Sequence, residues 1–362
     1  MIDDIIWCNF LNIKQIYGNF PVNFLETIPQ YDFGAFKSYP KYQFVYDKLF
    51  ITQSQNIPSG KLNEIDINDE SIDYPIFIKP RWGHTSASSK DCYKIKDKNQ
   101  LNKYIHKPNM MWSTFINANE TMTDFVMKDG QILYQLTYEY SPKQNVFADD
   151  WKYISPLSKP PNKIIEWVHK HLPDYTGPLN VQYRDDIIIE VSLRFARRGS
   201  YLKSTGNSNL IHNINNTIGD KSHLEWNYQP NVSFRPYYSF KCWIPFPIIY
   251  ILPNKVMEYI TFMTNSRDFF EYYFEPTGSN GTVFFQFQHY NFKTGMKIKK
   301  CIEILFLLCQ MFFIIMTFVC IYAIHQSKTN KLGYHMLGLL LILYMTTFLN
   351  SYYHYSNIYR IL

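Results

Sequence analysis

Two apolar runs around a short polar turn carry the side chains best suited to chemistry in this chain. Residues 179–194 read LNVQYRDDIIIEVSLR. Both runs are rich in Val and Ile, and Arg184-Asp185-Asp186 separates them, which predicts a β-hairpin with a three-residue loop. That loop would pair Tyr183 with Ile187, Gln182 with Ile188 and Asn180 with Glu190. Residues opposite one another share a face of a sheet, so the polar side chains should project to one side. They are Asn180, Gln182, Glu190 and Ser192.

Oxygen-bearing side chains on one face of a hairpin could hold a divalent cation. Mg²⁺ prefers octahedral oxygen coordination, with one or two carboxylates supplemented by substrate phosphates. The predicted metal ligands are Gln182, Glu190 and Ser192. The alternative is a solvated hairpin whose polar face meets only water, and the hairpin taken alone favours that alternative.

A second candidate feature lies upstream, where the apolar run Tyr74–Ile78 leads to Lys79 and then to a loop that contains Gly83 and Ser86. A lysine at the end of a strand can neutralise phosphate charge, and backbone N–H groups of a small-residue loop can surround an anion. The chain has no G-x-x-x-x-G-K-[ST] motif, so this is not a P-loop. The lysine therefore needs partners from elsewhere in the chain to make a phosphate site.

The order of several segments resembles that of an ATP-grasp domain, most closely the carbamoyl-phosphate synthetase and carboxylate-amine ligase branch. The segments are Asp47–Phe50, Ile78–Pro80 with the following loop, Glu120–Asp124, Asn180–Gln182 and Ile189–Arg194. The resemblance covers about residues 40–215. It implies an α+β fold whose two subdomains clasp ATP.

The resemblance also implies roles for single residues around the phosphates. Lys48 and Lys79 resemble the family lysines that bind the nucleotide, and Gly83 and Ser86 fall in the loop that covers its phosphates. Arg194 resembles the family arginine near the γ-phosphate. Lys79 and Arg194 are therefore the expected catalytic residues.

The adenine and metal positions follow in the same way. Phe115 falls in the hinge whose backbone binds adenine, and Glu120 resembles the acidic residue after that hinge. Gln182 and Glu190 resemble the metal ligands. The implied cofactors are ATP and Mg²⁺, with Mn²⁺ as a substitute, and the implied reaction is activation of a carboxylate as an acylphosphate that an amine or similar nucleophile attacks. The partners would be a small carboxylate and an amine, or a protein acceptor.

Some positions depart from the family pattern. Ser192 stands where the family usually has Asn, and a hydroxyl is a weaker metal ligand than an amide carbonyl. The covering loop has one glycine, Gly83, where family members often have several. These departures leave two alternatives open: an active ligase, and a catalytically inactive, membrane-tethered nucleotide-binding scaffold.

Composition limits the classes of function. The formal net charge of +6 is spread over 362 residues without a basic stripe, which argues against a nucleic-acid partner. The six cysteines show no metal-binding or disulfide spacing, which fits a reducing compartment. The expected domains are a short N-terminal segment (1–40), the ATP-grasp core (41–218) and an aromatic-rich subdomain or linker (219–296). Within the last, Lys241–Leu252 should be extended, Asn254–Phe270 helical and Thr282–His289 a strand.

The C-terminal region predicts membrane insertion. Residues 301–324 are nearly all apolar and long enough for the roughly 20 residues of a bilayer crossing, and 334–352 form a second predicted span. Lysines are more frequent before the first span than between the spans, so both ends of the pair should face the cytosol, together with the ATP-grasp domain. Membrane lipid is then a partner. The alternatives are a buried helical hairpin of a soluble domain and a purely structural membrane protein without nucleotide.

Overall fold

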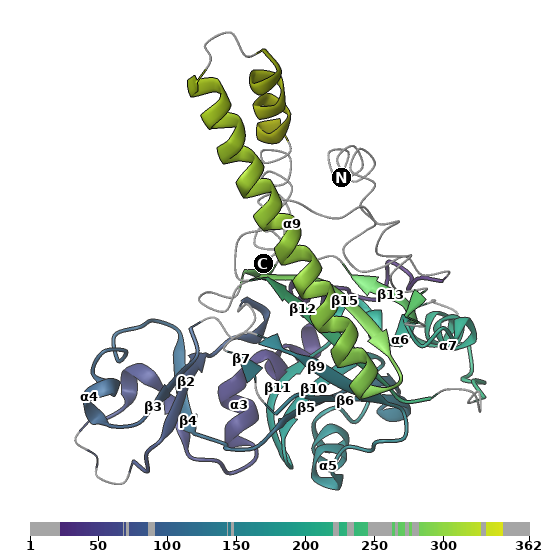
Figure 1. Cartoon of the computed structure of the whole chain (residues 1–362). Coiled ribbons are helices and arrows are strands. Elements are labelled where there is room, and N and C mark those ends of the chain that lie inside the picture. The colour runs from purple at the N-terminus through teal and green to yellow at the C-terminus, as the bar shows by residue number, and fades with distance from the viewer. Residues whose placement is uncertain are drawn as a thin grey trace. The chain divides into compact units, whose positions relative to one another are not determined.

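The computed structural model divides into two compact units, which are described separately. The larger unit comprises residues 20–147 and 152–236, and the smaller unit comprises 148–151 and 237–361 together with 1–19 (Figure 1). The structure describes residues 22–67, 69, 72–85, 91–142, 144–145, 148–219, 224–229, 235–244, 263–264, 267–271, 275–276, 282–326 and 331–342.

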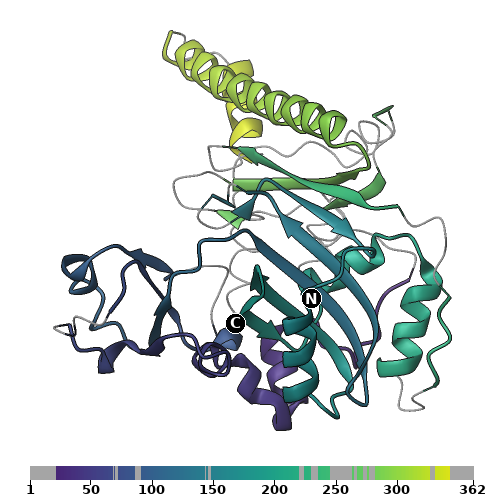
Figure 2. The same cartoon turned by 90° about the horizontal axis from the view of Figure 1, so that it is seen from below.

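The larger unit contains a small antiparallel sheet in the order β1-β4-β2-β3. Its strands are β1 (Ser59–Lys61), β2 (Ile76–Pro80), β3 (Tyr93–Ile95) and β4 (Met110–Thr114), with the short helix α4 (Lys98–Leu101) after β3. Alternate residues of β2 point to one side, where Ile76 and Ile78 pack with Leu62, Ile95 and Leu101 in a core of their own. In Figure 2 these blue strands form a lobe apart from the teal strands of the second sheet.

A second antiparallel sheet runs in the order β11-β10-β5-β6-β9. Its strands are β5 (Glu120–Lys128), β6 (Gln131–Tyr140), β9 (Trp151–Ser155), β10 (Gly177–Arg184) and β11 (Ile187–Ser192). The two-residue strands β7 (Gln144–Asn145) and β8 (Ala148–Asp149) lie between β6 and β9 in the sequence.

One face of this second sheet is apolar and the other polar. Odd-numbered residues of β10, such as Leu179 and Val181, pack with Val191, Trp167 and Val168 in the main core. Helices cover that face: α2 (Asp32–Ser38), the 3₁₀ helix η1 (Pro40–Tyr46), α3 (Lys48–Gln53) and α5 (Asn162–His171). The chain after β11 forms η4 (Ala196–Gly199), α6 (Ser200–Lys203), α7 (Ser208–Ile214) and the π-helix η5 (Asn215–Gly219).

The predicted hairpin forms, but its predicted register is wrong. Arg184 pairs with Ile187, Gln182 with Glu190 and Asn180 with Ser192. Only Asp185 and Asp186 remain in the turn, and Asp185 takes a positive φ of 52° that a tight turn demands and that Asp tolerates. A register shift next to Tyr183 compensates for the shorter turn. Because the slip amounts to two positions, the polar residues still share a face, as expected.

The smaller unit pairs its strands in the order β12-β15-β13, with β14 beside β15. Its elements are β12 (Tyr237–Ile244), β13 (Arg267–Glu271), β14 (Glu275–Pro276), β15 (Thr282–His289) and the helix α9 (Phe292–Gln326). The strand prediction for Thr282–His289 is confirmed. The helix prediction for Asn254–Phe270 is wrong at Arg267–Phe270, because these residues belong to β13, which pairs with β15; most of the rest lies outside the described residues. The extended prediction holds for Lys241–Ile244, and 245–252 also lie outside them.

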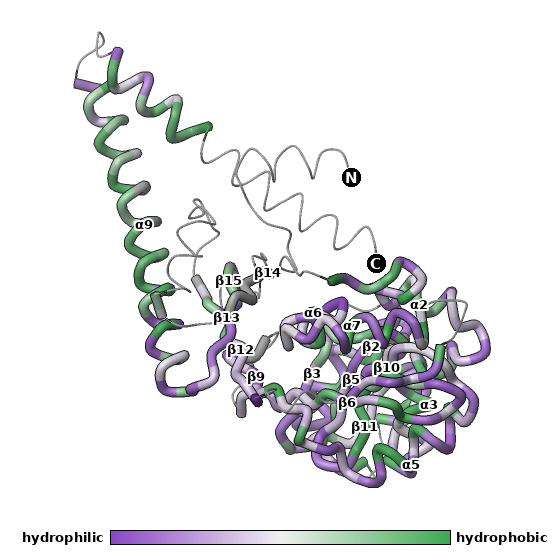
Figure 3. Tube along the Cα trace, turned by 90° about the vertical axis from the view of Figure 1, so that its right-hand side faces the viewer, coloured by the Kyte–Doolittle hydropathy of each residue, from purple (hydrophilic) through white to green (hydrophobic). Residues whose placement is uncertain are grey.

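Within the described residues, α9 is the one helix long and apolar enough to cross a membrane. In Figure 3 most of its length is green, whereas hydrophilic purple segments mark its beginning. A shorter apolar helix, Lys331–Ile342, covers the start of the second predicted span, and 343–352 lie outside the described residues.

Candidate functional site

Lys48 is the first residue of α3, and its neighbours hold it at the start of that helix. The Asp47 carboxylate caps α3 by accepting a hydrogen bond from Leu49 N at 3.0 Å. The Arg81 guanidinium, just after β2, donates its Nε–H to the same carboxylate at 2.8 Å. Lys48 N also donates to Arg81 O at 2.9 Å. These bonds tie Lys48 to the end of the strand that carries Lys79.

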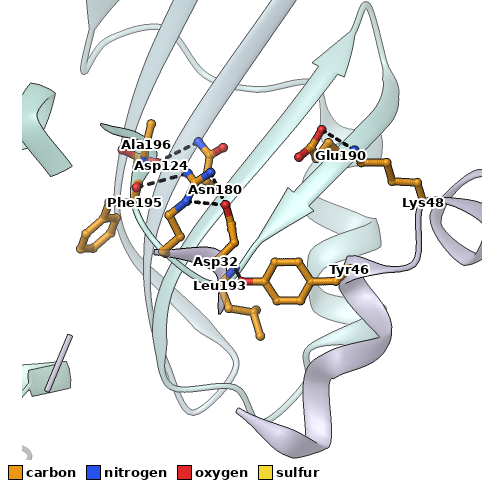
Figure 4. Close-up of polar contacts among 10 residues, drawn as sticks. Asp32, Tyr46, Lys48, Asp124, Asn180, Glu190, Leu193, Phe195 and Ala196 are labelled. Atoms are coloured by element: carbon orange, nitrogen blue, oxygen red, sulfur yellow. Dashed lines mark hydrogen bonds and ion pairs between the residues drawn. The ribbon is translucent and has the colours of Figure 1, made fainter. Parts of the chain in front are cut away.

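Two buried lysines and one carboxylate make up what we call the phosphate cluster: Lys48, Lys79 and Glu190. Lys48 Nζ lies 3.2 Å from Glu190 Oε2, and Lys79 Nζ donates to the Ile189 carbonyl at 2.9 Å. Figure 4 shows Lys48 reaching from α3 toward Glu190 on β11. The Glu190 side chain is 27% exposed, whereas the lysines are nearly buried. Solvent therefore reaches the cluster from the side of the carboxylate.

Charge in the phosphate cluster is unbalanced toward the positive. The pKa of Lys79 is lowered to about 8, chiefly by burial and next by the neighbouring Lys48, while Glu190 opposes the shift. Two ammonium groups lie near Glu190, and the Glu120 carboxylate also acts to raise the pKa of Lys79. A polyanion bound here would favour the charged form of both lysines, which is the arrangement expected of a phosphate-binding site.

Glu120 is the first residue of β5 and belongs to a row of polar residues that crosses the sheet. Its carboxylate lies 3.2 Å from Arg184 Nη2, and burial raises its pKa while Arg184 and Lys152 oppose that shift. Across the strands, Arg184 is opposite Glu120, and Tyr140 is opposite Lys152. Lys152 is buried, with Nζ 3.3 Å from the Tyr201 hydroxyl and 4.3 Å from the centre of the Tyr140 ring. No sequence motif includes Lys152. Its charge within the strand sequence WKYIS is the feature that could have marked it as a candidate site residue.

Deeper on the same face lies a closed set of polar side chains around Asp124 on β5. Its carboxylate accepts hydrogen bonds from Tyr138 Oη (2.6 Å), Asn180 Nδ2 (2.9 Å) and Ala196 N (2.9 Å). Burial raises the pKa of Asp124 to about 6, although those hydrogen bonds act to lower it. Ser192, expected as a metal ligand, pairs with Asn180 across the strands and is only 1% exposed. The structure thus places Ser192 beside this set rather than in the phosphate cluster.

Arg194 is also held in a closed environment. Its Nε and Nη2 donate to Asp32 Oδ2 at 3.0 and 2.7 Å. Burial acts to lower the pKa of Arg194, but the Asp32 carboxylate outweighs it and the pKa is raised. The Tyr46 hydroxyl accepts a hydrogen bond from Leu193 N at 3.0 Å (Figure 4). We call Asp32, Arg194, Asp124 and Asn180 the buried network; sequence reasoning missed its two aspartates because they come from distant segments.

The remaining predicted residues lie around these two groups. Gly83 is buried at the start of η3 (Gly83–Thr85), and a Cβ there would meet Tyr46 at an ordinary 3.5 Å, so no steric demand explains the glycine. Ser86 lies outside the described residues. Phe115 follows β4, and its backbone N–H donates to Pro75 O at 3.2 Å. That N–H is already engaged within the chain.

A metal ion would find few protein ligands in this arrangement. Gln182 is directly opposite Glu190 across the hairpin, so an amide and a carboxylate oxygen donor stand side by side next to the lysines. Among the described residues, no three His, Cys, Asp or Glu side chains come together as a metal site would require. Glu190 and Gln182 therefore suit an ion that takes most of its ligands from phosphate and water, as Mg²⁺ does.

Comparison by sequence finds relatives that are much longer than this chain. No protein-family model matches the chain. The chain is 24% identical over 198 residues to the carbamoyl phosphate synthase large chain of Saccharolobus solfataricus, and 25% identical over 189 residues to that of Sulfurisphaera tokodaii. The aligned part covers 50% and 47% of this chain but only 18% of either relative.

Comparison by structure finds a similar fold in solved structures of a ligase and a synthetase. The L-amino acid ligase from Bacillus licheniformis superimposes with a TM-score of 0.51 at 13% identity, covering 71% of this chain and 70% of its own. The N5-carboxyaminoimidazole synthetase from Staphylococcus aureus complexed with ADP gives 0.50 at 14% identity, covering 72% and 71%. Identities this low establish the fold alone.

Proposed function

We propose that this chain, an α+β protein with a fold of the ATP-grasp type, is an ATP-dependent ligase that activates a carboxylate for attack by an amine. The observation that carries the proposal is the phosphate cluster. Three segments far apart in the sequence, α3, β2 and β11, bring Lys48, Lys79 and Glu190 together at a partly open position. The relatives by sequence and structure are ATP-grasp ligases, which supports the same conclusion.

In the proposed reaction, a carboxylate oxygen of the substrate attacks the γ-phosphorus of ATP and ADP leaves. The nitrogen of an amine then attacks the acylphosphate carbon, and phosphate leaves with the proton that the nitrogen loses. Lys48 and Lys79 would offset the charge of the phosphates. Such a reaction needs no side-chain nucleophile, because positioning of the reactants and electrostatic stabilisation are enough. Mg²⁺, or Mn²⁺, held by Glu190 and Gln182 would supply further charge stabilisation when bound.

The proposed substrates are a small carboxylate and an amine nucleophile, with a protein acceptor as the other option. The structurally similar proteins are an L-amino acid ligase and an N5-carboxyaminoimidazole synthetase, whose names refer to small molecules. Lys152, a buried cation on the same sheet face as Glu120, is a further residue whose charge would suit an anionic substrate.

A second candidate function is the membrane-tethered nucleotide-binding scaffold without catalysis. A specific observation favours it: Arg194, expected at the γ-phosphate, is bound by Asp32, and Ser192 is buried. The scaffold would bind Mg·ATP through the phosphate cluster but release no ADP with any substrate.

We further propose that α9 anchors the chain in a membrane. Its length and apolar composition support one crossing, and residues 334–352 would make a second. The lysines at the start of α9 favour a cytosolic location for the part of the chain that precedes it, by the positive-inside rule.

The test is an ADP-release screen on the full chain purified in detergent, over amino acids and small carboxylates with Mg·ATP. A ligase gives ADP release that depends on one carboxylate and one amine. Thermal stabilisation by Mg·ATP without ADP release in any mixture identifies the scaffold, and absence of both effects overturns the nucleotide proposal.

A further inference from the structure

The first part of α9 belongs to the folded smaller unit and not to a free anchor. Its buried side chains Ile298, Ile302 and Phe306 pack with aromatic residues of β12 and β15, including Phe240 and Phe285. Gly295 allows this approach, because a Cβ there would lie 2.1 Å from the Phe240 ring. The helix therefore leaves the sheet only after about Phe306.

Two charged residues in this first part, Lys299 and Glu303, are paired within the same unit. Lys299 pairs with Glu303 one turn later and lies 3.6 Å from Asp150. The Glu303 carboxylate also accepts a hydrogen bond from Trp243 N at 2.8 Å. A carboxylate fixed in this way to the end of β12 stays with the folded unit, because moving an ion into hydrocarbon is expensive.

Beyond Glu303 the character of the helix surface changes abruptly. Residues 304–324 contain no charge, and at 1.5 Å per residue they extend about 31 Å, close to the roughly 30 Å hydrocarbon thickness of a bilayer. Their outward side chains are apolar and open; Leu308, Phe312 and Phe318 are 62%, 59% and 67% exposed. Gln310 is buried. A surface like this matches lipid rather than water.

A stripe of lysines precedes this apolar surface on the same side of the helix. Lys293, Lys297 and Lys300 are exposed, and their spacings of four and three residues place them on one face. The same spacing continues into Ile304 and Leu308. Lys300 lies about 6 Å along the axis from Ile304, which is the depth of a headgroup layer, and lysine side chains reach toward headgroups readily.

We propose that α9 enters the hydrocarbon at Ile304 and that Lys293, Lys297 and Lys300 bind the headgroups of anionic lipids in the cytosolic leaflet. The proposal rests on the membrane crossing proposed for α9. It shifts the start of the crossing from Cys301 to Ile304 and makes the smaller unit a platform on the membrane surface. Negative headgroups complement the stripe, and the acidic residue that follows it on α9, Glu303, is engaged by Lys299 and by Trp243 N.

Three native cysteines on α9 test where the membrane begins. Variants that keep only Cys301, Cys309 or Cys320 are reconstituted as full chains in vesicles, with an impermeant maleimide on both sides of the bilayer. Cys301 should react, whereas Cys309 should react only after denaturing detergent is added; Cys320, which is buried within the chain, is the protected control. Reaction of Cys309 in intact vesicles would overturn the crossing and, with it, the lipid surface, while leaving the ligase proposal to its own ADP-release test.

Lipid preference tests the lysine stripe itself. A fluorophore on Cys301 is quenched by chain-spin-labelled phosphatidylserine or phosphatidylcholine, and the ratio of the two affinities is measured. Each lysine near an anionic surface contributes about a fivefold gain in affinity. The wild type should therefore bind phosphatidylserine at least fivefold more tightly than phosphatidylcholine at low salt. The ratio of the two affinities should fall toward one in the double variant Lys297→Gln/Lys300→Gln and, for the wild type, in 1 M salt. The ratio should stay high in the control Lys331→Gln, which changes an exposed lysine beyond α9. A wild-type ratio near one, or a ratio unchanged in the double variant, would overturn the proposal.

Discussion

The phosphate cluster and the buried network lie on the same face of one sheet, yet they are built differently. In the phosphate cluster, two lysines meet one carboxylate that is 27% exposed. In the buried network, the Asp124 carboxylate accepts three hydrogen bonds, and Arg194 is matched by Asp32. A partly open site with two lysines can take a ligand, whereas the closed one, although Asp32 Oδ1 and Asn180 Oδ1 find no hydrogen-bond partner there, holds its elements in place. Sequence resemblance assigned ligand roles to residues of both.

This contrast changes the meaning of Ser192. As a metal ligand it would have been the weak point of an active ligase. Buried opposite Asn180, it fills space beside the buried network instead, and the proposed metal ligands reduce to Glu190 and Gln182.

The largest expected effect comes from the open site. Glu190→Gln removes the carboxylate that balances Lys48 and would hold the metal, so ADP release should fall by about 10³-fold, or about 4 kcal/mol. Stability should also fall, because the buried Lys48 loses this carboxylate. The control is Glu64→Gln, which breaks an exposed pair with Lys61 and should leave turnover intact. Equal turnover in the two variants would remove Glu190 from the site.

The next effect belongs to the buried network and concerns stability. Arg194→Met leaves the Asp32 carboxylate buried without its partner, which should lower the free energy of unfolding by about 3 kcal/mol. Denaturant titration of the full chain measures it. Adding Asp32→Asn to Arg194→Met should recover most of the loss. Failure of the second change to recover stability would mean that the pair is not what holds this region together.

Nucleotide affinity should depend on pH through Lys79. Its pKa of about 8 means that the free site loses a proton as pH rises from 7 to 9, and bound phosphates would restore it. Mg·ATP affinity should therefore fall about tenfold over that range, or about 1.4 kcal/mol, as measured by isothermal titration. Lys79→Arg stays charged and should show no such fall. A wild-type affinity that does not change between pH 7 and 9 would place Lys79 away from the phosphates.

The smallest effect distinguishes the two regions by the property that depends on pH, which is nucleotide affinity for the phosphate cluster and folding stability for the buried network. The Asp124 pKa of about 6 lies above its ordinary 3.8, so the protonated form favours the folded chain. That stabilisation is complete below the ordinary pKa and is lost as pH rises through 6. From pH 5 to 7 the unfolding free energy of the wild type, relative to Asp124→Asn, should fall by about 1 kcal/mol. An increase over that range would show that Asp124 is ionised at low cost.

The features that depend on local sequence pattern could be predicted. Alternation in β10 and β11 gave the shared polar face, and β15 and the apolar stretch of α9 could be predicted from composition alone. The register of the hairpin could not be predicted, because its pairing depends on a two-residue turn and a bulge together. Asp32 could not be matched to Arg194 either, since 162 residues separate them and only the packing of α2 brings them together.

Binding of Mg·ATP to the phosphate cluster is the central claim, and thermal stability measures it most directly. The full chain in detergent is melted with and without Mg·ATP, in the wild type, in Lys48→Gln/Lys79→Gln and in Lys163→Gln, which removes an exposed lysine paired with Asp186. Mg·ATP should raise the melting temperature of the wild type and of Lys163→Gln but not that of the double variant. No rise in the wild type, or an equal rise in the double variant, would contradict the claim.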